Sequence, residues 1–294
     1  MPHQLNWQEI CQMIPKRKAD AQKGDFGRLL CITGSRNMPG ACLLSTQAAL
    51  RGGAGLVTVA TAPENPMRLA AAAPEAMWLP LETDEAGFLR SSDQNRKTLE
   101  KQLSRANAVL LGCGLGVTEE TRRLVYWVLE QAECPVVLDA DGLNCAVSCI
   151  ELSRRTGKDW ILTPHPGEMA RLTGHSIPQI QENRVETATQ FAAAYPVTLA
   201  LKGAGTLVAQ GSRLAQNPTG NPGMSRGGSG DVLAGLIAAF VAQGIPSWEA
   251  ACAGVYLHGL AGDAAAAALS QQAMLPRDLL VYLPQVLVKL EQER

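Results

Sequence analysis

The sequence predicts an α/β protein in which helices cover both faces of a mostly parallel central sheet. Short apolar runs alternate along the chain with helical stretches of about 10 to 15 residues, as expected of βαβ units. The apolar runs carry few polar residues, which is typical of strands that are buried on both faces. Glycine and proline gather where the runs end, at the edge where such sheets collect their ligand-binding loops.

Strands are predicted where the apolar runs are short and rich in Leu, Val and Ile. In chain order they lie at 28–33, 56–60, 108–111, 136–139, 160–163, 197–202 and 206–210. Gly112, Gly114 and Gly116 follow the third strand, and Pro164 and Pro166 follow the fifth. Loops are therefore expected at both places.

Helices are predicted where the apolar pattern runs longer and Ala and Leu are frequent. They lie at 41–52, 119–131, 179–194, 230–243 and 248–268, the last as one helix or a pair. The polar segment 82–105 is predicted to be a helix with exposed loops, and Asp141 opens a further segment after the fourth strand. No internal repeat or low-complexity linker divides the chain, so one domain over 1–294 is the simpler interpretation.

Composition and charge narrow the class of protein. The 294 residues are 46% hydrophobic and 18% charged, with 26 Lys and Arg against 27 Asp and Glu. Neither disorder nor a nucleic-acid partner is expected from these values. The sequence shows no signal peptide and no apolar run long enough to span a membrane. Because the eight cysteines form no Cys-x-x-Cys pair, they are interpreted as buried free thiols of a cytoplasmic protein.

The strongest local signal is a glycine loop at 217–231 that leads directly into an apolar helix. The first amides of a helix lack intrahelical partners, and glycines let them approach a phosphate closely. Asp231 at the start of that helix has two interpretations, as a helix cap or first-turn residue and as a base for a substrate hydroxyl. The loop matches neither a Walker A motif nor Gly-x-Gly-x-x-Gly, and the local residues leave both interpretations of Asp231 open.

Two strand ends carry further candidates. Lys202 precedes Gly203-Ala204-Gly205-Thr206, where it could reach phosphate oxygens or simply be the solvated lysine of a hairpin. The segment Thr163-Pro164-His165-Pro166-Gly167-Glu168 has two prolines, which we expect to exclude a helix and to present His165 and Glu168 on a rigid loop. A loop that contacts a ligand is therefore favoured over a metal site.

The order of these motifs resembles the ADP-dependent NAD(P)H-hydrate dehydratase family. The matching segments lie at 23–28, 34–41, 51–59, 112–116, 139–144, 163–168, 202–206 and 220–231. They occur in the family's order and span nearly the whole chain. The resemblance implies a ribokinase-like, three-layer α/β/α fold, and an enzyme that removes water from C6 of hydrated NADH or NADPH (NADHX or NADPHX). Bacterial members of the family use ADP, and eukaryotic members prefer ATP.

The resemblance also implies roles for individual residues. Asp231 would be the catalytic base and would contact the hydrated dinucleotide together with Ala41, Gly114 and His165. The residues expected to hold ADP are Lys202, Gly203, Ala204, Gly205, Thr206, Asn221, Gly227, Gly228, Ser229 and Gly230. A magnesium ion would bridge the nucleotide phosphates, and no protein residue is assigned to it. A homotetramer is expected.

Three departures from the family pattern stand out. The N-terminal epimerase domain that many members carry is not expected here, so epimerisation of the hydrate would depend on a separate enzyme. Cys113 stands where the family commonly has proline. Arg226 stands where small or hydroxyl residues are usual, and it could either meet a phosphate or point to solvent.

Two other functions compete with a dehydratase. A small-molecule kinase of the same fold, acting on a sugar or hydroxyethylthiazole, would use the same kind of glycine loop and aspartate base. A non-catalytic nucleotide-binding module is less favoured, because both the loop and Asp231 are present.

Overall fold

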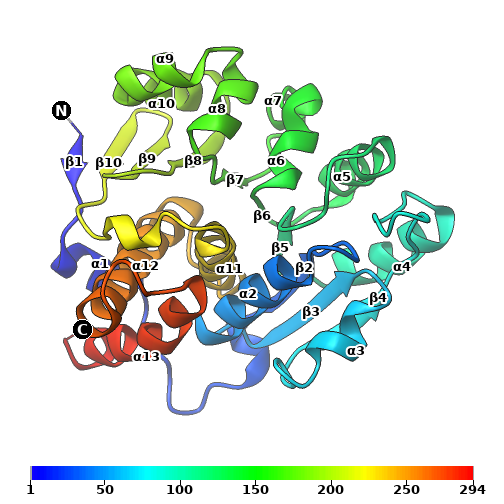
Figure 1. Ribbon diagram of the computed structural model, residues 1–294, viewed down its shortest axis with the longest axis horizontal. Helices are drawn as coiled ribbons and strands as arrows, with labels where there is room; N and C mark the ends of the chain where they lie inside the picture. The colour runs from blue at the N-terminus through cyan, green and yellow to red at the C-terminus, as the bar shows by residue number, and fades with distance from the viewer. Residues whose placement is uncertain (1, 294) are drawn as a thin grey trace.

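The computed structural model describes residues 2–293, apart from the side chains of residues 155 and 156. Within this part of the chain ten strands form one sheet (Figure 1). The strands are β1 (His3–Gln4), β2 (Arg28–Ile32), β3 (Leu56–Thr61), β4 (Met77–Pro80), β5 (Ala108–Leu111), β6 (Val136–Leu138), β7 (Trp160–Leu162), β8 (Val197–Leu201), β9 (Leu207–Gln210) and β10 (Arg213–Gln216).

The sheet is mostly parallel, as predicted. Its strand order is β1-β10-β9-β8-β7-β6-β5-β2-β3-β4, and only β9 runs antiparallel to its two neighbours. From β2 the chain first moves outward to β3 and β4, and it then returns to β5 on the other side of β2. The strand order therefore reverses at β2 and β5, and parallel sheets bind ligands in the crevice at the carboxyl ends of the strands where such a reversal occurs.

Helices cover both faces of the sheet (Figure 1). The α-helices are α1 (Trp7–Met13), α2 (Pro39–Arg51), α3 (Asn65–Leu69), α4 (Asp93–Leu103), α5 (Glu119–Gln131), α6 (Asp141–Ala146), α7 (Leu152–Thr156), α8 (Pro166–Thr173), α9 (Ile177–Glu182), α10 (Arg184–Ala194), α11 (Ser229–Ala242), α12 (Ser247–Leu269) and α13 (Pro276–Glu293). Short 3-10 helices lie at η1 (Lys23–Phe26), η2 (Val147–Cys149) and η3 (Pro222–Met224).

Two hydrophobic cores show how the three layers form. Successive side chains of a strand point to opposite faces, so Leu29 and Cys31 of β2 pack with α2, α11 and α12, whereas Leu30 and Ile32 pack with the α4, α5 and α10 side. A smaller core joins α2, α11 and α13 on the outer side of the first layer. The predicted three-layer α/β/α arrangement is confirmed.

The structure differs from the sequence prediction at several elements. The short strands β1, β4 and β10 were not predicted, and the predicted helix at 179–194 is divided into α9 and α10 at Asn183. The segment 248–268, which was predicted as one helix or a pair, forms one helix, α12. Six of the eight cysteines are buried free thiols, namely Cys31, Cys42, Cys113, Cys145, Cys149 and Cys252.

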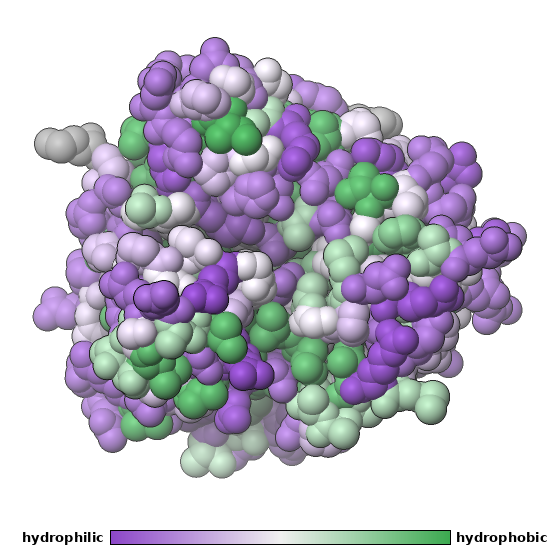
Figure 2. Space-filling model, viewed as in Figure 1, coloured by the Kyte–Doolittle hydropathy of each residue, from purple (hydrophilic) through white to green (hydrophobic). Residues whose placement is uncertain are grey.

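The surface carries no continuous apolar band on the face seen in Figure 2, where hydrophilic side chains predominate and apolar ones form scattered patches. Some large apolar side chains are exposed, among them Val281 and Val288 on α13. None of the helices within the described residues has the length and hydropathy needed to cross a membrane.

Candidate active site

Backbone hydrogen bonds join the two loops that follow β2 and β5. The amide of Gly34 donates to the carbonyl of Cys113 at 2.9 Å, and the amide of Ser35 donates to the carbonyl of Gly114 at 2.6 Å. Gly114 has a φ of +66°, and a Cβ there would lie 2.9 Å from the Cβ of Ala41. Only glycine fits this contact. Ala41 and Gly114, both predicted to contact substrate, therefore lie side by side.

Helix α11 begins at the same edge of the sheet. Gly228 caps it with a φ of +108°, and Ser229, Gly230 and Asp231 form its first turn. Asp231 is thus a first-turn residue and not the N-cap. The amides of this turn have no intrahelical acceptors and carry the positive end of the helix dipole. An anion held here would lie beside the Asp231 carboxyl group.

Asp231 has an unusual proton affinity for a carboxylic acid. Burial, reinforced by the nearby negative charge of Asp139, raises the pKa of Asp231 to about 7. A hydrogen bond with Cys113 and the charge of Lys202 act in the opposite direction and are outweighed. A carboxyl group with a pKa near neutrality is suited to exchange protons with a substrate.

Lys202 is directed into this cluster and is not a solvated hairpin lysine. Its Nζ lies 2.6 Å from Oδ1 of Asp139 and 3.8 Å from Oε2 of Glu168. Burial lowers the pKa of Lys202, but the two carboxylates outweigh burial and raise it, so Lys202 stays charged. A Cβ on Gly230 would lie 3.2 Å from this Nζ, which places Lys202 directly against the first turn of α11.

The predicted loop around His165 is in fact the start of a helix. Pro166 occupies the first position of α8, where a proline needs no amide partner. His165 caps the helix, and Glu168 accepts a hydrogen bond from the His165 amide at 2.7 Å. The expectation that the prolines exclude a helix is therefore wrong. Glu168 is buried rather than presented, whereas His165 remains exposed beside it.

The turn after Lys202 is shaped by two glycines. Gly203 and Gly205 have φ values of +141° and +62° in the hairpin between β8 and β9. The Thr206 hydroxyl closes the turn by donating to the Gly203 carbonyl at 3.0 Å, and Ala204 is exposed at its tip. Arg184 holds the hairpin from α10, because its guanidinium donates to the carbonyls of Leu201 and Lys202 at 3.1 Å each.

The middle of the glycine loop is held by partners within the protein. Asn221 donates from Nδ2 to Asp263 and accepts the Gly223 amide at 3.0 Å, so it caps η3. Gly227 is exposed and a Cβ there would meet no atom within 4 Å. Arg226 donates to the carbonyl of Gln272, on the connection between α12 and α13.

Several residues of this site could not be identified from the sequence. Asp139 is nearly fully buried and accepts hydrogen bonds from Lys202 and from the Thr163 hydroxyl, the latter at 2.7 Å. Arg184 contacts the hairpin, and Cys113, noted in the sequence only as a departure from the family pattern, contacts Asp139. Glu168, which was predicted on the loop after the fifth strand, also contacts the cluster. The one available signal was the place of Asp139 directly after a buried strand, because strand ends of a parallel sheet meet at one edge.

Among residues 2–293, one group of three side chains is close enough to share a metal ion. The ligand atoms of Cys113, Asp139 and Asp231 all lie within 4.8 Å of one another. Magnesium prefers oxygen ligands in near-octahedral geometry, whereas this group includes a thiol and the Lys202 cation pairs with Asp139. The cluster therefore does not fit a resident magnesium ion.

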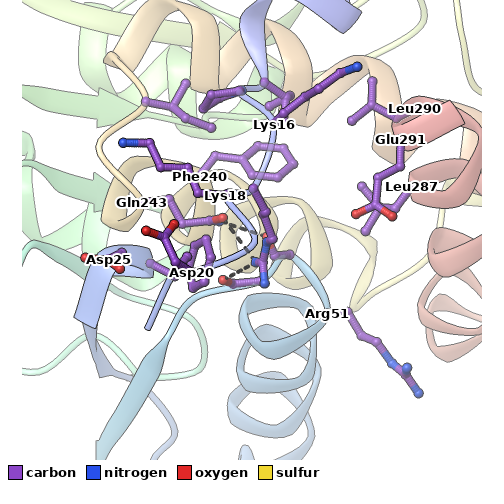
Figure 3. A pocket seen from close by; sticks show the side chains of 18 residues that line it. Lys16, Lys18, Asp20, Asp25, Arg51, Phe240, Gln243, Leu287, Leu290 and Glu291 are labelled. Carbon is purple, nitrogen blue, oxygen red and sulfur yellow. Dashed lines mark hydrogen bonds between the residues drawn. The ribbon is translucent and has the colours of Figure 1, made fainter. Parts of the chain in front are cut away.

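A separate cavity of about 520 Å³ lies at the other end of α11 (Figure 3). Gln243 at the end of α11, Gly52 at the end of α2 and Leu290 near the end of α13 line it. Arg17 also lines this cavity, and its guanidinium donates to the Gly53 carbonyl at 2.7 Å. Cations suit this place, because helix C-termini carry partial negative charge. The cavity contains none of the predicted site residues.

Comparisons with known proteins agree with this geometry. A family model described as NAD(P)H-hydrate dehydratase matches residues 29–285. The bifunctional NAD(P)H-hydrate repair enzyme Nnr of Moorella thermoacetica is 43% identical over 281 residues, which are 95% of this chain and 53% of the relative. The ADP-dependent (S)-NAD(P)H-hydrate dehydratase of Xanthomonas campestris is 36% identical over 280 residues, 95% of this chain and 93% of that protein. The chain thus spans about half the length of the bifunctional relatives it matches.

Solved structures are similar over the whole chain. The ADP/ATP-dependent NAD(P)H-hydrate dehydratase of Bacillus subtilis, co-crystallised with ATP and Mg²⁺, has a TM-score of 0.82, 31% identity and 99% coverage of both chains. A ribokinase-like superfamily protein of Enterococcus faecalis has a TM-score of 0.84 at 30% identity, with 99% and 96% of the two chains covered. These matches confirm the predicted ribokinase-like fold. A hydroxyethylthiazole kinase of Pyrococcus horikoshii is 19% identical with a TM-score of 0.61 and shares the fold alone.

Proposed function

Because the chain belongs to the NAD(P)H-hydrate dehydratase family, we propose that it removes water from (S)-NAD(P)H hydrate in an ADP-dependent reaction. The product would be NADH or NADPH, so the reaction repairs a damaged cofactor. The proposed activity is that of a hydro-lyase that uses ADP as its co-substrate.

One observation carries this proposal above all. Asp231, with its pKa near 7, lies in the first turn of α11, where the amides of Gly228 and Gly230 and the Lys202 cation favour an anion. A phosphate at this turn would bring its transferable group next to the base. Ala41 and Gly114 lie at the crevice formed by the neighbouring strand ends. They offer space without large side chains for a flat nicotinamide ring.

The residues suggest how the reaction would proceed. Asp231 would accept the proton of the C6 hydroxyl while the oxygen takes the terminal phosphoryl group of ADP, releasing AMP. The amides of Gly228 and Gly230 would stabilise the charge on the transferred group, whereas the Ser229 amide already donates to the Arg226 carbonyl. The C6–O bond then breaks, inorganic phosphate leaves with the electron pair, and a proton leaves the adjacent ring carbon. Hydroxide is a poor leaving group, and phosphate is a good one.

The remaining predicted residues fit a nucleotide in different ways. Lys202 is the direct phosphate ligand, and Gly203, Ala204, Gly205 and Thr206 would cover the nucleotide at the hairpin tip. Asn221 would act by shaping the loop, because its side chain already has partners, and the open position of Gly227 leaves backbone accessible. His165, exposed at the start of α8, would contact the hydrated dinucleotide. We propose that Mg²⁺ arrives with the nucleotide, since the side-chain cluster does not fit it.

Two assembly features belong to the same proposal. The protein would form a homotetramer, with exposed apolar side chains such as Val281 and Val288 of α13 available for contacts. Light scattering should then give a mass of four 31.2 kDa chains. A separate epimerase would convert the (R) hydrate to the (S) hydrate that this protein uses.

The deciding experiment is an absorbance assay. Purified protein is mixed with (S)-NADHX, Mg²⁺ and either ADP or ATP, and recovery of absorbance at about 340 nm is followed. Recovery that requires nucleotide, with one phosphate released for each NADH formed, supports the proposal. If no NADH appears and a phosphate ester of an added alcohol accumulates instead, the protein is a kinase of this fold.

A further inference from the structure

The first part of the glycine loop, residues 217–224, lies against one face of α12. Side chains of the loop donate hydrogen bonds to backbone carbonyls of this helix. The side-chain Nδ2 of Asn217 donates to the carbonyl of Val255 at 3.1 Å. The Thr219 hydroxyl donates to the carbonyl of Tyr256 at 2.9 Å. Both acceptors belong to the middle of α12. The start of the loop is therefore fixed to this helix and not to the sheet alone.

Asp263, two turns further along α12, holds the tip of the loop with both carboxylate oxygens. Oδ2 accepts a hydrogen bond from the Gly220 backbone amide, and Oδ1 accepts one from Nδ2 of Asn221, each at 2.9 Å. Two glycines of α12 make room for this contact. A Cβ on Gly259 would lie 2.0 Å from the Thr219 hydroxyl, and one on Gly262 would lie 2.2 Å from the Met224 sulfur.

His258, on the same helix, holds the other end of the loop. Its Nε2 lies 3.0 Å from the carbonyl oxygen of Ser229, in the first turn of α11. Burial, assisted by the charge of Lys202, lowers the pKa of His258 to about 4. The ring is therefore neutral at physiological pH, and a neutral ring with its proton on Nε2 donates to this carbonyl.

We infer that His258 and Asp263 are positioning residues that hold the nucleotide loop in its binding shape from helix α12. The inference rests on the proposed function in taking ADP as the ligand of this loop. His258 orients the peptide group of Ser229, and with it the direction of the amides that meet the phosphate. Asp263 fixes Gly220 and Asn221, where the chain turns toward those amides. Ala41 and Gly114, which face the hydrated dinucleotide, belong to other elements.

The test compares ADP binding with hydrate binding in variants of the two residues. Asp263→Asn keeps the shape but replaces one acceptor with a donor that faces another donor. His258→Leu removes the donor to Ser229, whereas His258→Gln retains an N–H group. We expect Asp263→Asn and His258→Leu to raise the Kd and KM for ADP by about tenfold or more. The KM for NADHX should stay within about twofold, and His258→Gln should recover part of the ADP affinity.

The control variant is Asp25→Asn, because Asp25 also accepts a backbone amide, that of Gln22 at 2.7 Å, at the end of the molecule that holds the separate cavity. It should bind ADP as the wild type does. ADP binding is measured by calorimetry, and thermal melting shows that each variant is folded. Folded Asp263→Asn and His258→Leu proteins with wild-type ADP affinity, or equal losses of ADP and hydrate affinity, would overturn the inference.

These outcomes also separate the inference from the proposed function. Wild-type protein that binds ADP without converting NADHX would refute the dehydratase activity, while the calorimetric comparison of the variants would still test the role of α12. Wild-type protein that binds no ADP would refute both. If His258→Leu fails to fold, Asp263→Asn decides the result.

Discussion

At the scale of single residues, the proposed chemistry depends on a partly desolvated carboxylic acid. Asp231 is half-buried next to Asp139, and the Lys202 cation does not fully offset desolvation and the charge of Asp139, so the pKa of Asp231 is about 7. A base must be deprotonated to accept a proton. We therefore expect kcat to be low at pH 5.5, to rise about tenfold per pH unit at first, and to level off above about pH 7.

The pH profile is measured with saturating ADP and (S)-NADHX between pH 5.5 and 9. Asp231→Asn is the matched control, because it keeps the size of the side chain and cannot accept the proton. It should lose at least about 100-fold in kcat while binding ADP with nearly wild-type affinity. An active Asp231→Asn enzyme would show that another group is the base.

The same pKa predicts that Asp231 lowers the stability of the fold at neutral pH. The folded protein holds this proton up to about pH 7, whereas the unfolded chain releases it near the ordinary value of 3.8. The folded state therefore binds more protons between these values, and its stability falls as the pH rises through that window. Asp231→Asn carries no such charge and should be the more stable protein at pH 8, by on the order of 1–2 kcal/mol.

Urea unfolding of both proteins at pH 4.5 and pH 8 measures this difference. The advantage of Asp231→Asn should be clear at pH 8 and nearly absent at pH 4.5, where Asp231 is protonated in the folded protein. An advantage of equal size at both pH values would mean that it has another origin than the buried charge.

At the scale of elements, the first turn of α11 is the proposed binding site for the phosphate groups of ADP. Gly230 is the second residue of this helix, and a Cβ there would lie 3.2 Å from Nζ of Lys202. Alanine favours a helix over glycine by about 0.5–1 kcal/mol. We expect Gly230→Ala to keep or raise the melting temperature and to weaken ADP binding by on the order of tenfold, because the methyl group stands between the amides and Lys202.

Gly40→Ala is the control for this variant. Gly40 is also the second residue of a helix, α2, and a Cβ there would meet no atom within 4 Å. It should change the melting temperature in the same direction without changing the affinity for ADP, as calorimetry would show. Unchanged ADP binding in Gly230→Ala would place the phosphate away from this turn.

The elements differ in how far the sequence could predict them. The buried strands from β2 to β9 could be predicted except for β4, because their apolar residues are driven into the core whatever surrounds them. β1, β4 and β10 lie at or near the sheet edges, and hydrogen bonds to a neighbouring strand define them more than their own residues do. The start of α8 was missed because a proline suits the first position of a helix as well as a loop.

The residues of the candidate site also differ in how far the sequence could indicate them. Asp231, Lys202 and the glycines could be named as candidates because each belongs to a local pattern with a chemical meaning, although that pattern alone left the role of Asp231 open. Asp139 could not, because its role comes from Lys202, which lies 63 residues further along the chain. His258 looks like an ordinary residue of an apolar helix until the fold places it against Ser229. Contacts of this kind arise only when strands and helices distant in sequence meet at one edge of the sheet.

At the scale of the whole molecule, one crevice and one base lead to a prediction about stereochemistry. Asp231 is fixed on the rigid helix α11, and Ala41 and Gly114 are packed against each other, so the hydroxyl can meet the base from only one face of the ring. We propose that these 294 residues convert the (S) hydrate alone. With a mixture of (R)- and (S)-NADHX and excess ADP, absorbance at 340 nm should rise quickly to the level set by the (S) fraction and then stop. Adding an NAD(P)H-hydrate epimerase should restart the rise and carry it to full recovery, and a sample without this protein gives the rate of spontaneous interconversion. Rapid, complete recovery without the epimerase would show that the protein either accepts both epimers or interconverts them itself.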